Sequence, residues 1–270
     1  MPILVGAVFP RVPGARYWSS LGIAELAPRR PLPRPAVLGR WRRAAPEGAR
    51  LTLLAPTETW KGPAGALRED PGSSEGVRWL MAAADALAAD ALVLSTGAEI
   101  TPGPRDRERL ARFVGRLARG RRPVVWLAGG LWEPEAAAEA ARGFGAVAGF
   151  DPLEAQAPPG SLAYARVHAI GAHARLGEGT LARIAETLLA ATAETSYVVL
   201  DAGEGPRRAR RLAEMLASGE IPRPGAIELD AGDDDDVDEA DDDEADDDED
   251  EADDEADDDE ADDDEADDDR

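Results

Sequence analysis

Eight short apolar runs, each the length of a β-strand, recur along the first part of the chain. They occupy residues 3–9, 22–26, 51–54, 91–94, 123–127, 146–150, 162–168 and 197–200. Most are separated by segments in which apolar residues recur at helical spacing, as in residues 76–89, 105–119 and 180–191. Strands that alternate with helices predict parallel βα units, and therefore an α/β domain.

The number of these units and the length of the chain predict a closed barrel. About 250 residues is typical of a TIM-type (β/α)8 barrel, and residues 1–229 make a slightly short one. Periodicity does not establish closure, so an open doubly wound sheet is the alternative. Neither a G-x-G-x-x-G motif nor a P-loop follows the first predicted strand, so nucleotide binding of those two kinds has no support.

The charge of the chain is divided between two regions. Residues 230–270 hold 31 of the 55 Asp and Glu but only Arg270 of the 30 Lys and Arg, which gives −30. The remaining 24 acidic and 29 basic residues give residues 1–229 a charge of +5. A repeat of Glu, Ala and Asp has almost no apolar surface to bury and repels itself. We therefore predict one barrel domain, residues 1–229, followed by a disordered low-complexity tail, residues 230–270.

Composition excludes several classes of protein. The chain has no Cys, which excludes disulfides, thiolate metal sites and Cys nucleophiles, and 2 His are too few to favour a multi-histidine metal site. No apolar stretch reaches the length of a membrane span, and Met1-Pro2-Ile3 lacks the features of a signal peptide. We therefore expect a cytoplasmic, bacterial protein with no membrane partner. Direct binding of nucleic acid is not expected either, because the tail would repel phosphates.

The seventh predicted strand, residues 162–168, carries the main candidate for a functional site. Tyr164, Arg166 and His168 share one face of this strand, and the opposite face is small and apolar, so the polar face should point into the barrel. Arg166 and His168 then lie near the C-terminal end of the barrel, where TIM barrels hold their sites. Arg166 needs a carboxylate or an anion, and Asp201 on the adjacent strand is the natural partner. His168 could serve as a general acid or base; the alternative is a structural Arg166–Asp201 pair with His168 as a satisfied core residue.

Glu25, at the end of the second predicted strand, is a further candidate. With Asp201 it could form a carboxylate pair for acid/base chemistry or hold one hard divalent cation; alone it is a salt-bridge partner. The candidate catalytic residues are therefore Arg166, His168, Asp201 and Glu25. The sequence identifies no cofactor and no metal ligands.

Three other features have both a functional and a structural interpretation. The loop of residues 203–206 and the arginines that follow it could hold a phosphate, or the arginines could lie on a solvated helix face. Trp60 and Trp132, near predicted strand ends, could line a pocket or belong to the core. His173 lies in a predicted loop and should be exposed.

The order and spacing of several motifs resemble the YecE-like family, also called domain of unknown function 72, over most of residues 2–218. The motifs are Glu25, Leu32-Pro33, Val37-Leu38-Gly39-Arg40-Trp41, Ala45-Pro46-Glu47-Gly48, Ala55-Pro56, Trp132, Tyr164-Ala165-Arg166-Val167-His168 and Asp201. Among them, residues 164–168 resemble the family's seventh-strand signature Y-v-R-x-H. The resemblance implies a TIM-type barrel.

The sequence departs from the family pattern at other strand ends. The polar segment E-I-N-S-T-F-Y of the family is here Glu25-Leu26-Ala27-Pro28-Arg29-Arg30, and the Lys expected before Ala55-Pro56 is Leu54. Ser95-Thr96-Gly97-Ala98 and Trp126-Leu127-Ala128-Gly129 replace polar stretches of the fourth and fifth strands. The chain therefore resembles a diverged member whose pocket has lost polar groups.

Two functions are compatible with these features. The first is a barrel that binds a small polar or anionic ligand at its C-terminal face, with hydrolase-like or isomerase-like catalysis as its widest extension. The second is a non-catalytic scaffold whose acidic tail engages a basic protein partner or metal ions. The surviving Arg166 and His168 favour the first, and the lost polar groups favour the second.

Overall fold

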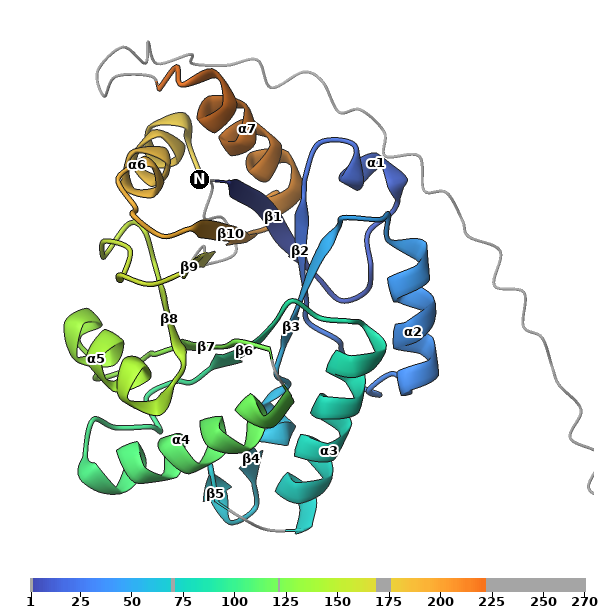
Figure 1. Ribbon diagram of the computed structural model, residues 1–270, viewed down its shortest axis with the longest axis vertical. Coiled ribbons are helices and arrows are strands. Elements are labelled where there is room, and N and C mark those ends of the chain that lie inside the picture. The colour runs from blue at the N-terminus through green and yellow to red at the C-terminus, as the bar shows by residue number, and fades with distance from the viewer. Residues whose placement is uncertain (1, 69–70, 121, 169–175, 222–270) are drawn as a thin grey trace, which may run out of the picture. The chain divides into compact units, whose positions relative to one another are not determined.

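The computed structural model of the chain describes residues 2–68, 71–120, 122–168 and 176–221, and these form a closed barrel of eight parallel strands (Figure 1). The barrel strands are β1 (Ile3–Phe9), β2 (Ile23–Leu26), β3 (Arg50–Leu54), β6 (Ala91–Ser95), β7 (Val124–Leu127), β8 (Val147–Phe150), β9 (Leu162–His168) and β10 (Thr195–Asp201). Each strand pairs with its neighbours in the chain, and β1 pairs with both β2 and β10. The TIM-type barrel is confirmed, and the open sheet is wrong.

Helices surround the strands, as Figure 1 shows. They are α1 (Ala15–Trp18), α2 (Pro35–Ala44), α3 (Pro71–Ala86), α4 (Pro104–Leu117), α5 (Pro134–Phe144), α6 (Glu178–Leu189) and α7 (Gly205–Ser218), with 3-10 turns η1 (Thr57–Thr59) and η2 (Ala118–Gly120). A proline in the first turn, where its missing N–H costs nothing, begins α2, α4, α5 and α7. The helix predicted at residues 76–89 begins and ends earlier, as α3. A short hairpin, β4 (Lys61–Gly62) with β5 (Gly65–Ala66), precedes α3 and was not predicted.

Side chains alternate between two apolar layers along the strands. Residues that point inward, such as Ile23, Val93 and Val125, pack together inside the barrel. Their neighbours in sequence, such as Leu92 and Leu94, pack with the helices in an outer layer. Tyr164 belongs to the inner layer, so Arg166 and His168, which follow it at a period of two, face the barrel axis above it.

One helix of the regular βα pattern is missing. Residues 151–161, all described, connect β8 directly to β9 through turns and contain no helix. On the outer side of β8, Ala148 is accordingly partly exposed. The connection leaves space between α5 and α6 at this point of the barrel wall.

Two sequence predictions concern residues outside the described ranges. The acidic tail, residues 230–270, and the exposed loop around His173 both lie there. The boundary at residues 229 and 230 thus stays a prediction. Within the part of the chain that the structure describes, no helix has both the length and the apolar character to span a membrane.

Candidate functional site

The structure brings together all four residues that the sequence selects. Glu25 comes from β2, Arg166 and His168 from β9, and Asp201 from β10. His168 and Asp201 are register partners at the ends of their strands, which places both at the C-terminal mouth of the barrel. Three strands therefore supply one connected group of charged side chains.

Arg166 bridges two carboxylates. Its Nε donates to Oε1 of Glu25 at 2.9 Å, and its Nη2 donates to Oδ2 of Asp201 at 2.9 Å. The Arg166 side chain is 12% exposed and Glu25 is 0% exposed. Burial alone would lower the pKa of Arg166, but the attraction of Glu25 and Asp201 outweighs it and raises that pKa. The predicted Arg166–Asp201 pair is present, and Glu25 is a second partner of the same guanidinium.

Glu25 is held from below by a hydroxyl pair that the sequence reasoning missed. Tyr164 donates its hydroxyl to Oε2 of Glu25 at 2.6 Å, and the Tyr164 hydroxyl lies 3.0 Å from Oγ1 of Thr52. Burial raises the pKa of Glu25, while Arg166 and the Tyr164 hydroxyl oppose that rise. Both oxygens of Glu25 are thus bonded inside the barrel, which makes it a fixed support of Arg166.

His168 is not a core residue. Its Nδ1 lies 2.8 Å from Oδ2 of Asp201, and its side chain is 62% exposed. A carboxylate oxygen only accepts, so Nδ1 carries the proton of this bond, and in the neutral form of the ring Nε2 is the unprotonated nitrogen. Nε2 makes no hydrogen bond to any residue within the described ranges. The core alternative for His168 is therefore wrong, and the ring presents an acceptor at the barrel mouth.

Asp151 is a further member of the mouth that the sequence reasoning did not select. It follows β8 directly, and its Oδ1 accepts the backbone N–H of Leu153 at 2.8 Å. Burial raises the pKa of Asp151. The Leu153 N–H opposes this rise, and so does His168 when its ring carries a positive charge. The signal was present in the sequence, because Asp151 ends a predicted barrel strand in the same way as Asp201.

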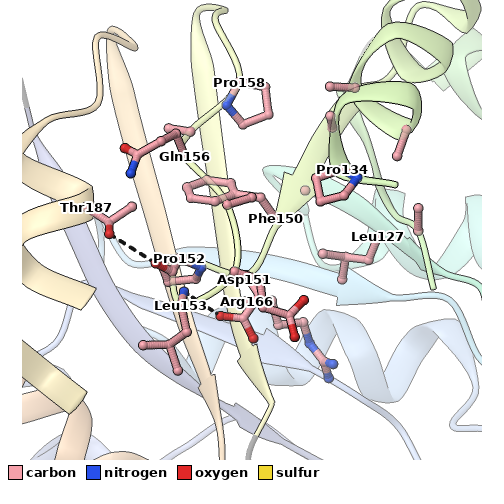
Figure 2. Close-up of a pocket in the computed structure, with 18 of the residues that line it drawn as sticks. Leu127, Pro134, Phe150, Asp151, Pro152, Leu153, Gln156, Pro158, Arg166 and Thr187 are labelled. Carbon is pink, nitrogen blue, oxygen red and sulfur yellow. Dashed lines mark hydrogen bonds between the residues drawn. The ribbon is translucent and has the colours of Figure 1, made fainter. Parts of the chain in front are cut away.

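A cleft of about 840 Å³ opens above these residues. It reaches from Arg166 and His168 at the mouth, past Phe150, into the space left by the missing helix. Figure 2 shows Thr187 of α6 on one side of Phe150 and Pro134 of α5 on the other. The Thr187 hydroxyl donates to the carbonyl of Pro152 at 3.0 Å and ties the β8–β9 connection to α6.

Two strands on the opposite side of the mouth end in apolar side chains. Leu54 of β3 and Leu127 of β7 pack against the inner layer, where the family pattern carries polar groups. A Cβ at Gly149 would overlap Leu127, so glycine at this position lets Leu127 fill the mouth. On the outer side of β7, Trp126 donates its Nε1 to the Thr96 hydroxyl at 2.9 Å.

The remaining sequence candidates lie outside the charged group formed by Glu25, Arg166, His168 and Asp201. Trp132 lines the cleft and donates Nε1 to the carbonyl of Ile100 at 2.8 Å, whereas Trp60 is buried and does not line the cleft. In the loop of residues 203–206, the N–H of Gly205 is bonded to the carbonyl of Ala202.

Two of the arginines after that loop form ion pairs with neighbouring side chains. Arg208 pairs with Glu204 at 3.0 Å and Arg211 pairs with Glu178 at 2.9 Å. Such ion pairs are typical of a helix face that contacts solvent. Across the described ranges, no cluster of three or more Asp, Glu and His is arranged to hold a metal ion.

Comparison with known proteins shows what the fold is similar to. No family model and no curated protein matches the sequence. Among solved structures, a DUF72 family protein from Enterococcus faecalis is 12% identical, with a TM-score of 0.61, over 84% of this chain and 100% of that chain. The TTHB071 protein from Thermus thermophilus is 18% identical, with a TM-score of 0.50, over 82% of this chain and 100% of that chain. A D-tagatose 3-epimerase-like protein is 13% identical, with a TM-score of 0.50, over 81% of this chain and 96% of that chain.

These comparisons show similarity of fold. The Enterococcus faecalis protein belongs to the family, domain of unknown function 72, that the sequence motifs resemble. The structural comparison thus confirms the resemblance at the level of the barrel. It assigns no ligand and no reaction to this chain.

Proposed function

We propose that the chain is a diverged YecE-like TIM-barrel protein that binds a small polar ligand in the C-terminal cleft, with His168 as its acid/base group. The observation that carries the proposal is the bond between Nδ1 of His168 and Oδ2 of Asp201 at 2.8 Å, on a ring that is 62% exposed. This bond fixes the ring. Nε2 of the same ring, which lines the cleft, has no partner among the described residues and is the atom that would contact a ligand. A base must lie within hydrogen-bond reach of the proton that it takes, and an oriented imidazole meets that need.

The buried part of the network supports this role by holding Asp201 in place. Arg166 bonds Oδ2 of Asp201, and Glu25 holds Arg166 through its Nε. A site whose supporting groups are already bonded needs little reorganisation when a ligand arrives. The volume of the cleft, about 840 Å³, lies within the range of small-molecule sites.

Proton transfer is the reaction class that these groups can perform. An imidazole that accepts a proton at Nε2 while Asp201 stabilises the resulting cation can serve isomerisation or hydrolysis of a polar substrate. The epimerase-like structural neighbour favours the isomerase alternative by analogy of fold alone.

The test is a binding screen with the full chain. Polyols, sugars, amines, organic acids and phosphates are tested for a rise in thermal unfolding temperature, since a ligand that binds only the folded state must stabilise it. His168→Asn and Asp201→Asn should abolish any stabilisation, whereas Arg211→Ala, on the exposed face of α7, should keep it. Stabilisation that survives both mouth substitutions, or no stabilisation by any compound, would reject the proposal.

The acidic tail supports a second, separate proposal. Its charge of −30 over residues 230–270 suits a basic protein surface or metal ions. Binding of the full chain to such a partner should weaken steeply as the salt concentration rises from about 50 to about 300 mM, because the Debye length shortens over that range. Binding that does not respond to salt would reject it.

A further inference from the structure

The positive charge of Arg166, which lines the cleft, is already matched by two carboxylates. Its Nε and Nη2 both donate to carboxylates, one from Glu25 and one from Asp201. When the His168 ring is neutral, two carboxylates around one guanidinium leave this part of the mouth with an excess of one negative charge. An anionic ligand that approached Arg166 would also meet the negative charges of both carboxylates.

Asp151 adds to that excess. Only its Oδ1 is bonded, to the N–H of Leu153, and Asp151 forms no ion pair with any residue in the described ranges. The side chain is partly buried in the wall of the cleft. A partly desolvated carboxylate without a cation is costly, and a ligand that brings a positive charge would offset that cost.

The other charged residues of the cleft do not reverse this balance at the mouth. Arg142 and Arg183 lie on the flanking helices α5 and α6, and both are exposed. Arg183 points a guanidinium nitrogen at the carbonyl of Leu153, 3.4 Å away. The charged groups that act on Asp151 are Glu154, which has the same sign, and His168.

We propose that the ligand of this cleft carries a cationic nitrogen, an ammonium or a guanidinium, that pairs with Asp151 beside His168. The inference rests on the proposed function and narrows its ligand to a positively charged polar molecule. Of the two ligand types that the sequence predicts, polar and anionic, this inference favours a polar ligand and disfavours an anionic one. The pairing would place a polar group of the ligand next to Nε2 of His168.

Three probes of matched length test the charge preference. They are 4-amino-1-butanol, 1,4-butanediol and 4-hydroxybutyrate, which are cationic, neutral and anionic at pH 7. Binding to the full chain is measured by chemical-shift titration in 150 mM salt. We expect the amino alcohol to bind at least about tenfold more tightly than the diol, because a charge-assisted bond replaces none, and the acid to bind most weakly.

Asp151→Asn should remove the preference while the diol binds as before. The matched control is Glu139→Gln, an exposed carboxylate on α5 outside the cleft, which should leave the preference intact. If the diol or the acid binds as tightly as the amino alcohol, or if Asp151→Asn keeps the preference, the inference fails and the proposed function stands. If no probe and no compound of the wider screen binds, the proposed function fails and the inference fails with it.

Discussion

The two halves of the barrel mouth differ in what their strands present to the cleft. On one half, β2, β9 and β10 end in a connected set of charged side chains centred on Arg166. On the other half, β3 and β7 end in Leu54 and Leu127, which pack on the inner apolar layer. The charged groups of the mouth are therefore concentrated on one side.

The largest effect should come from removing the cation of the charged half. Arg166→Met leaves Glu25, which is fully buried, without a positive partner, and should destabilise the fold by about 3–5 kcal/mol. Leu127→Met introduces the same residue on the apolar half and should cost less than about 1.5 kcal/mol. Chemical denaturation of both variants measures the difference.

The double variant Glu25→Gln with Arg166→Met separates lost charge pairing from lost packing. It should recover part of the stability that Arg166→Met loses, because the fully buried carboxylate without a cation is gone. Equal stability of Arg166→Met and Leu127→Met would show that the two halves do not differ.

A smaller effect is expected from the hydroxyl below Glu25. Tyr164→Phe keeps the ring but removes the donor to Oε2 of Glu25, and should cost about 2–3 kcal/mol. Thr52→Val removes the other partner of that hydroxyl and should cost less, since Tyr164 can still donate to Glu25. A Tyr164→Phe variant as stable as the unmodified chain would mean that Glu25 does not depend on this bond.

The corresponding bond beside the apolar half joins neutral groups. Thr96→Val removes the acceptor of the buried Trp126 Nε1 and should cost about 1–2 kcal/mol, less than Tyr164→Phe. Urea denaturation of both variants in parallel gives the ranking. A reversed order would remove the energetic distinction between the two halves.

The smallest effect concerns pH. Folding raises the pKa of Asp151, so the folded chain binds that proton more tightly than the unfolded chain, and stability falls as pH rises from the ordinary aspartate pKa of about 3.9. Asp151→Asn removes this loss, so the stability of the variant relative to the unmodified chain should increase between pH 4 and pH 7.

Asp106 provides a control, because folding lowers its pKa whereas folding raises that of Asp151. The N–H and hydroxyl of Thr101 hold the pKa of Asp106 below its ordinary value, so its contribution to stability is present above that ordinary value and is lost on acidification. Asp106→Asn should therefore lose stability relative to the unmodified chain as pH rises. The same pH trend in both variants would contradict these assignments.

The sequence predicts the barrel and the charged half of its mouth because both follow from local patterns. Alternation along residues 162–168 is enough to orient Arg166 and His168, and the end of the next strand is enough to place Asp201 beside them. The number of partners of Arg166 is not a local property, because Glu25 reaches it across the barrel from a strand far away in sequence. For this reason an anionic ligand was a reasonable prediction from sequence and is disfavoured by the geometry.

The features that the sequence reasoning missed have physical causes of the same kind. The hydroxyls of Thr52 and Tyr164 look like ordinary strand residues until the closed barrel sets them 3.0 Å apart. The connection between β8 and β9 has no helix and therefore no apolar periodicity from which its course could be predicted. The β4–β5 hairpin has strands of only two residues, which are too short to give a periodic pattern. Asp151 could have been selected, because it ends a strand at the same face of the barrel as Asp201.

The tautomer of the His168 ring shows whether Asp201 holds His168 with Nε2 free of protein partners at the cleft. The chain has 2 His, so selective ¹⁵N-histidine labelling yields two sets of ring signals, and a His173→Asn variant identifies that of His168. At a pH where the rings are neutral, we expect the His168 proton on Nδ1, and we expect Asp201→Asn to lose this preference. A proton on Nε2 of His168, or a tautomer that Asp201→Asn does not change, would contradict it.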